Sequence, residues 1–167
     1  MPRISYQNQA DLILVANKKK PVAWFEIEKK KPLSKKEIEK IKHILRKLNL
    51  PYQVKTTGNK KALTCSVGKD RKHLQALLKA DAKKNPKEKT RARGLALGYP
   101  KTAIAAFINK EVIEVKNLPK QIRESKEIKF LNFRLSKKHW QKEFKVVQKR
   151  ADTIKKLSPK LYKEITK

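Results

Sequence analysis

Hydrophobic and polar positions near the start of the chain predict a β-hairpin followed by a helix. Residues 11–16 form a short apolar run, and after a polar turn residues 22–28 alternate apolar and polar side chains, as a strand does. Ser34 precedes Glu37 by three positions, the spacing of a capping box, and apolar residues then recur at helical spacing until Pro51. The pattern predicts two paired strands and a capped helix.

The same arrangement repeats over the next thirty or so residues. Residues 52–56 and 62–67 read as strands joined by a turn, and Asp70 can cap a following helix. Cys65 alternates with apolar neighbours, which favours a small core side chain over a nucleophile. Two tandem units predict an α+β domain over residues 1–84, in which a four-stranded antiparallel sheet carries both helices on one face.

The remaining residues, 85–167, are predicted to form a helical region. A basic linker over residues 81–93, which overlaps the start of this region, leads into it. Apart from an extended stretch around residues 130–135, the largest element is a long helix over residues 136–157, followed by a short helix that begins at Ser158. We interpret the apolar stripe of the long helix as core-facing, with a homodimer interface as the alternative. The stripe consists of Trp140, Phe144, Val147, Ala151 and Ile154.

One segment within this region, residues 88–109, has the pattern of two short helices joined by a tight turn. Gly98 stands where a left-handed turn residue belongs, and Gly94 permits the two helices to approach closely. Pro100 suits the first turn of the second helix, whose buried face we expect to include Ile104 and Phe107.

This spacing resembles the helix-turn-helix of bacterial repressors over about twenty of the 167 residues. The resemblance implies a second helix in the DNA major groove. That helix would expose two alanines where base-reading side chains usually stand, so a compact hairpin without sequence-specific readout is the alternative. The residues expected to face the bases are Lys101, Thr102, Ala105, Ala106 and Asn109.

Charge changes the picture more than any motif. The chain has 45 Lys or Arg and 15 Asp or Glu, which gives a formal net charge of +30. The surplus is +8 over residues 1–50, +10 over residues 51–100 and +12 over residues 101–167, so no acidic segment offsets it. Such an excess opposes compaction and favours a polyanionic partner. The alternative is a lysine-rich genome composition, because lysine outnumbers arginine 37 to 8.

We therefore predict a non-catalytic nucleic-acid-binding protein that uses lysine–phosphate contacts. RNA or a ribonucleoprotein stands ahead of DNA, because an open sheet face with Trp24 would suit base stacking; coverage of Trp24 by the C-terminal region is the alternative. The expected contact residues are Lys18, Lys19, Lys20, Trp24, Lys60, Lys61, Lys83, Lys84, Lys87, Lys89, Arg91, Arg93, Lys101, Thr102 and Asn109. A nuclease, a helix-turn-helix-like DNA-binding regulator and a protein–protein adaptor are the alternative functions.

Several other classes find no support. No apolar run approaches the roughly 20 residues of a membrane span, and the start of the chain lacks a secretory signal, so we expect a soluble cytoplasmic protein. One cysteine and three scattered histidines predict neither a disulfide nor a metal site, and no glycine-rich phosphate loop is present. Glu26 and Glu28 are the one carboxylate pair a nuclease could use, but they also fit a surface salt-bridge ladder. We expect no cofactor, and the sequence offers no support for an enzyme.

Overall fold

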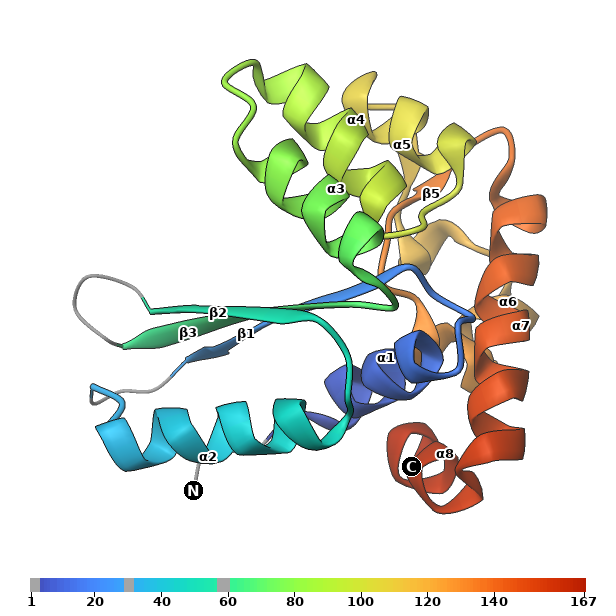
Figure 1. The fold of residues 1–167 in the computed structure, drawn as a ribbon. Coiled ribbons are helices and arrows are strands. Elements are labelled where there is room, and N and C mark those ends of the chain that lie inside the picture. The colour runs from blue at the N-terminus through green and yellow to red at the C-terminus, as the bar shows by residue number, and fades with distance from the viewer. Residues whose placement is uncertain (1–3, 29–31, 57–60) are drawn as a thin grey trace. The chain divides into compact units, whose positions relative to one another are not determined.

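The computed structural model describes residues 4–28, 32–56 and 61–167. The chain divides into two compact units, Met1–Leu77 and Leu78–Lys167 (Figure 1). Within the described residues, no helix has both the length and the apolar character needed to cross a membrane.

Unit 1 is built around a three-stranded antiparallel sheet with the strand order β1-β3-β2. Phe25 of β1 lies opposite Cys65 of the central strand, which in turn lies opposite Val54 of β2. The elements are α1 (Tyr6–Ala16), β1 (Val22–Glu28), α2 (Lys35–Lys47), β2 (Tyr52–Thr56), β3 (Ala62–Gly68) and the beginning of α3 (Arg71–Asp81).

The four-stranded sheet predicted from the sequence is wrong, because residues 11–16 belong to helix α1. The Ser5 hydroxyl accepts a hydrogen bond from the Asn8 amide and caps this helix, so the preceding polar residues extend the apolar run into eleven helical residues. A short apolar run without periodicity fits a buried helix as well as a buried strand. The first expected hairpin therefore does not exist.

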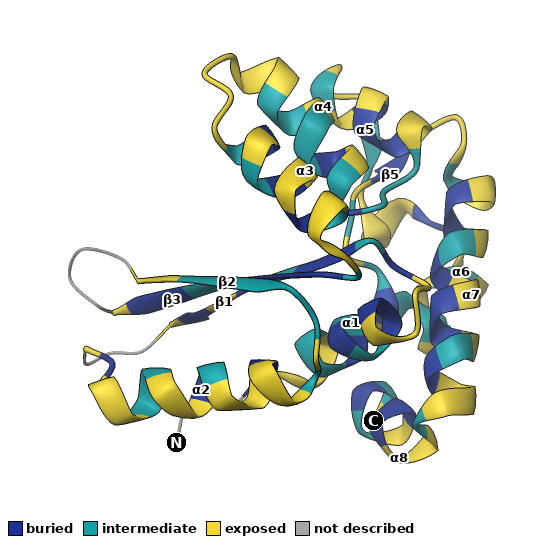
Figure 2. Cartoon of the chain, in the orientation of Figure 1, coloured by how far each residue is buried: buried dark blue, intermediate teal, exposed yellow. Residues whose placement is uncertain are grey.

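Helices α1 and α2 pack on the same face of the sheet and enclose the core of unit 1 (Figures 1 and 2). The alternation predicted for residues 22–28 is confirmed, with Phe25 and Ile27 buried and Glu26 exposed. The capping box of Ser34 and Glu37 is also present, so each side chain accepts a hydrogen bond from the backbone amide of the other residue at the start of α2. The core residues are Leu12, Val15, Ala23, Phe25, Ile27, Ile41, Leu45, Leu63, Cys65 and Val67, with Ile4 and Leu33.

Unit 2 consists mainly of helices with one two-stranded sheet, β4-β5. Its elements are the end of α3, α4 (Pro86–Ala96), α5 (Lys101–Ile108), β4 (Val112–Ile113), the 3₁₀ helix η1 (Val115–Asn117), α6 (Lys120–Arg123), the 3₁₀ helix η2 (Lys126–Phe130), β5 (Leu135–Ser136), α7 (Trp140–Leu157) and α8 (Pro159–Thr166).

Two boundaries in unit 2 differ from the sequence prediction. Helix α4 occupies much of the expected linker, because the Asn85 side chain accepts hydrogen bonds from the Lys87 and Glu88 amides and begins the helix there. The long helix begins at Trp140, whereas Ser136 lies in β5. Its stripe is buried at Phe144, Val147, Ala151 and Ile154, as the core interpretation predicts, and Trp140 is half-buried.

The environment of Cys65 leads to the first prediction. Burial raises the pKa of this thiol from 9.0 to about 12, so at about pH 8 only about one molecule in ten thousand carries the reactive thiolate. We expect iodoacetamide to leave the native protein unmodified and to alkylate it once denaturant unfolds the sheet, as mass spectrometry would record. Rapid alkylation of the native protein would contradict the burial of Cys65 in the sheet.

Candidate nucleic-acid interface

The helical hairpin predicted over residues 88–109 is confirmed as α4, a tight turn and α5. Gly98 has a φ of 73°, and the Tyr99 amide donates back to the Gly94 carbonyl at 3.0 Å, which closes the end of α4. The two helices approach closely at Gly94, where an added Cβ would lie 2.7 Å from Cγ1 of Ile104. The turn and this close approach define the relation of α4 to α5.

A buried carboxylate ties α5 to the rest of unit 2. Glu143 of α7 is only 1% exposed, and its Oε1 accepts hydrogen bonds from the Thr102 hydroxyl at 2.6 Å and the Ser136 hydroxyl at 2.8 Å. Its Oε2 accepts the Ser136 amide at 2.7 Å. The charge is therefore compensated by three donors, which join the first turn of α5 to β5 and α7.

A buried guanidinium ties the hairpin turn to the same helix. Arg150 is 7% exposed; its Nη2 donates to the Gly98 carbonyl at 2.9 Å and its Nη1 to Oδ1 of Asn132 at 2.8 Å. The guanidinium also lies 5.8 Å from the ring centre of Phe133, which packs against Tyr99 with 5.4 Å between ring centres. Glu143 and Arg150 thus hold both the turn and the following helix, and neither residue was predicted from the sequence.

Most of the cations predicted for the hairpin are on its surface. Lys83, Lys84, Lys87, Arg91 and Lys101 are exposed, and Lys89 is half-buried. Asn109 is exposed where α5 ends. The hairpin surface therefore contains a group of cations that come from both helices and from the segment before them.

Three of the contact residues predicted on or beside the hairpin have partners inside the protein. Arg93 forms an ion pair with Asp81 at 2.9 Å, so its charge is largely balanced locally. The Thr102 hydroxyl donates its hydrogen to Glu143, as described above, so this hydrogen is not available to a base edge. Lys83 also forms an ion pair, with Glu88 at 3.1 Å, but this pair is exposed and contributes little.

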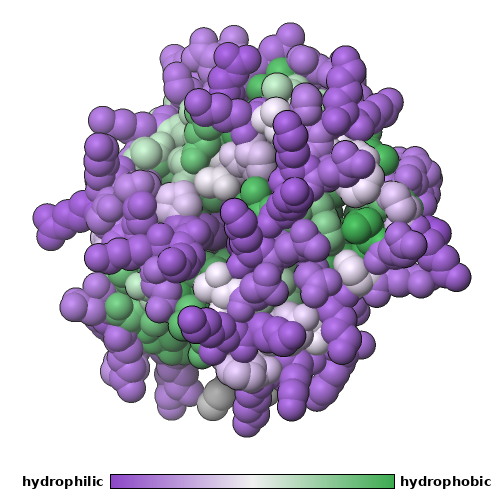
Figure 3. Space-filling view, turned by 90° about the vertical axis from the view of Figure 1, so that its right-hand side faces the viewer, coloured by the Kyte–Doolittle hydropathy of each residue, from purple (hydrophilic) through white to green (hydrophobic). Residues whose placement is uncertain are grey.

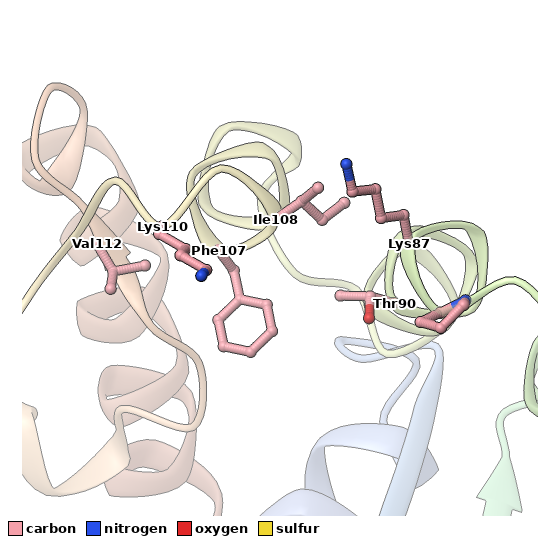
Figure 4. Close-up of a pocket in the computed structure, with 7 residues that line it drawn as sticks. Lys87, Thr90, Phe107, Ile108, Lys110 and Val112 are labelled. Carbon is pink, nitrogen blue, oxygen red and sulfur yellow. The ribbon is translucent and has the colours of Figure 1, made fainter.

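Two hollows lie along the seam between α4 and α5. The first, of about 400 Å³, is lined by Lys87, Thr90, Phe107, Ile108, Lys110 and Val112, together with Pro86 (Figure 4). The second, of about 260 Å³, is lined by Arg91, Leu95, Lys101, Ile104 and Ala105. Each hollow combines apolar side chains with two cations.

The expected burial of Phe107 is wrong. Ile104 is buried as predicted, but Phe107 is 52% exposed, and Ala106, expected on the surface, is buried. Phe107 points to the same side of α5 as Ala103 and Ile104, so the helical periodicity predicts its direction correctly. In the last turn of α5, however, that side opens into the first hollow, and the ring projects into it (Figure 4).

In unit 1 the structure separates the predicted contact residues. Lys18 and Lys19 are exposed, but Lys20 is only 2% exposed and its Nζ lies 2.6 Å from Oδ2 of Asp11, so it is a buried ion-pair partner rather than a surface contact. Lys60 lies outside the described residues. Lys61 is exposed beside Ala62, at the end of the sheet opposite Lys20. The strand between the two ends is about 20 Å long, so Lys61 does not form one patch with Lys18 and Lys19.

The sheet face that carries Trp24 is also acidic. Trp24 is half-buried, and because strand residues alternate, the exposed Glu26 and Glu28 share its face. Lys55 of β2 and Thr64 of β3 lie in the same row as Glu26. Two carboxylates beside one partly covered ring repel phosphates, so this face is a weaker candidate than the hairpin.

Comparison of the chain with protein-family models, with curated proteins and with solved structures found no match. The interpretation of the hairpin therefore depends on its own residues. Hydrophilic side chains cover most of the molecular face seen in Figure 3, with smaller hydrophobic patches between them. Among the described residues, no group of three His, Cys, Asp or Glu side chains is placed to hold a metal ion.

The buried carboxylate provides the second prediction. In Glu143→Gln, an amide NH₂ replaces one of the two accepting oxygens and meets a donor from Ser136 or Thr102. We expect the free energy of unfolding to fall by about 1–3 kcal/mol, measured by urea denaturation. As a control, Glu114→Gln removes a carboxylate from an exposed ion pair with Lys116 and should change the stability by less than about 1 kcal/mol. Equal effects of the two substitutions would contradict a structural role for Glu143.

Proposed function

We propose that this chain binds nucleic acid without cleaving it and that the α4–α5 hairpin makes the main contacts. The observation that carries the proposal is that exposed cations line two hollows on one firmly held element of a chain whose net charge is +30. Residues 81–110 contain eight Lys or Arg, and the two acids in this segment, Asp81 and Glu88, are both engaged in ion pairs within it.

Phosphate attraction is the mechanism that these residues support. Lysine and arginine side chains that neutralise phosphates release condensed counterions, so the affinity is mainly electrostatic and falls steeply as salt is added. Lys87 and Arg91 are four positions apart on α4, which places them on the same side of the helix. Lys101, at the start of α5, shares the second hollow with Arg91. Successive phosphates of a strand can therefore be bound by Lys87, Arg91 and Lys101 along the seam.

Sequence-specific reading of duplex DNA has less support. Of the residues expected to face the bases, Ala106 is buried and the Thr102 hydroxyl is engaged by Glu143. Lys101 and Asn109 are exposed, but one lysine and one asparagine give few base contacts. The preference for RNA that Trp24 suggested loses weight because of its acidic neighbours. The proposal is thus for phosphate-directed binding, whichever sugar the strand contains.

The third prediction compares two triple variants that each remove three positive charges. The hairpin variant carries Lys87→Gln, Arg91→Gln and Lys101→Gln, and the control carries Lys142→Gln, Lys145→Gln and Lys149→Gln on exposed positions of α7. We expect the hairpin variant to bind a labelled oligonucleotide about tenfold or more weakly than the wild type, and its slope of log affinity against log salt to be shallower by about 2. Fluorescence anisotropy between about 50 and 200 mM salt measures both quantities.

The control decides whether the hairpin or the overall charge is responsible. We expect the α7 variant to retain affinity within about threefold of the wild type, because only long-range attraction is reduced. Equal losses in the two variants would reject the hairpin as the binding surface, and an affinity that does not change with salt would reject phosphate-directed binding altogether. Labelled RNA and DNA incubated with and without magnesium should stay intact; cleavage would instead favour a nuclease.

A further inference from the structure

The hairpin contains more exposed apolar surface than phosphate binding requires. Among the described residues, the large hydrophobic side chain with the highest exposure is Phe107, at 52%, and the next is Leu95, at 46%. Phe107 lines the first hollow on the seam and Leu95 the second. Leaving such side chains in water has a free-energy cost, and their position among the cations points to a ligand with both flat apolar and anionic parts.

We propose that the Phe107 hollow accepts an unpaired nucleobase, which makes single-stranded nucleic acid the ligand of the hairpin. This inference rests on the proposed function, because it assumes that the cations of the seam attract the phosphates. An aromatic ring stacks on the face of any base, and the faces are available only where bases are unpaired.

The lining of the hollow fits a nucleotide part by part. The Phe107 ring projects from α5, while Lys87 and Thr90 come from the facing helix α4 and Val112 from β4 (Figure 4). The ring, Ile108 and Val112 offer an apolar surface, the Thr90 hydroxyl can exchange a hydrogen bond with a base edge, and the Lys87 and Lys110 ammonium groups are available to phosphate. The volume, about 400 Å³, lies in the range of small-molecule sites.

The second hollow continues the same arrangement along the seam. The step from Lys87 to Arg91 on α4 and from Ile108 to Ile104 on α5 is four residues, about one helical turn. Arg91 and Lys101 repeat the pair of cations, and Leu95 repeats the exposed apolar contact. A strand whose base stacks on Phe107 therefore meets two further cations at its next phosphates.

Charge argues against a second copy of the chain as the occupant. Two copies each have a net charge of +30, and each hollow is bordered by cations, so pairing the seams would bring like charges together in a partly dehydrated contact. An acidic partner is required, and a flat aromatic platform between cations matches a nucleotide more closely than it matches an aliphatic helix.

The fourth prediction separates base stacking from phosphate attraction. The probes are a labelled oligo-dT strand of about 12 nucleotides and an abasic strand of the same length, which has the phosphates but no bases. We expect Phe107→Ala to bind oligo-dT about 5- to 100-fold more weakly than the wild type and to bind the abasic strand within about twofold. Phe107→Tyr, which keeps a ring, should retain the binding of oligo-dT.

Two controls protect this comparison. Leu157→Ala truncates a side chain of similar exposure, 45%, at the end of α7, and it should bind both strands like the wild type. Because Phe107 is half in water, its truncation should leave the melting transition in circular dichroism nearly unchanged. A variant that unfolds is replaced by Phe107→Leu, which keeps the apolar volume, loses the ring and should show the same selective loss.

The outcomes distinguish this inference from the function on which it rests. Equal losses for oligo-dT and the abasic strand, or no loss for either, would overturn base stacking while phosphate-directed binding stands. Sedimentation that showed a dimer in the wild type and a monomer in Phe107→Ala would assign the hollow to self-association, and tighter binding of an acidic peptide than of oligo-dT would assign it to a protein partner. A wild type that binds neither strand would remove both proposals.

Discussion

The arrangement of unit 2 depends on two charges buried on one side of α7. Burying an ion is costly unless hydrogen bonds replace its lost hydration, and both Glu143 and Arg150 find such partners. The partners lie on the first turn of α5, on β5 and in the turn that follows α4, so satisfying the two ions fixes where the hairpin stands on α7. A hairpin held in this way presents its cations and its apolar side chains without further ordering, which favours binding because little conformational freedom is lost.

The large positive charge then decides what the hairpin surface can do. Ammonium groups stay in water, and the one lysine that is deeply buried among the described residues, Lys20, is paired with Asp11. Elsewhere the cations are distributed over separate surfaces, as on the outer side of α2 and the exposed positions of α7. Exposed apolar side chains also lie among cations on α2, at Ile44, and at the end of α7, at Leu157. On the α4–α5 seam, however, Phe107 and Leu95 line two hollows together with a pair of cations each, and this combination distinguishes the hairpin from a solvated surface.

Local signals in the sequence predicted the elements whose causes are themselves local. The alternation of apolar and polar residues predicted β1, and the Ser34–Glu37 capping box predicted the start of α2. Gly98 and Gly94 predicted the hairpin turn. The prediction failed where a residue's role depends on distant partners. The apolar run of α1 has no periodicity that separates a helix from a strand. Lys20, just before β1, forms an ion pair with Asp11 of helix α1, and the sequence pattern does not reveal this pair. The sequence contains a weak signal for the burial of Glu143 and Arg150, because both lie on the side of the helix that contains Val147 and Ile154. It contains no signal for the exposure of Phe107, because periodicity predicts the direction of a side chain and not what covers it.

Nuclear magnetic resonance can show, residue by residue, whether nucleic acid contacts the α4–α5 seam. Addition of a short oligo-dT strand to ¹⁵N-labelled protein should shift the backbone amide resonances of residues 86–112 first and furthest, with the Phe107 ring protons moving upfield under a stacked base. Shifts confined to the Trp24 face of the sheet, or spread evenly over the lysines of α2 and α7, would contradict the account.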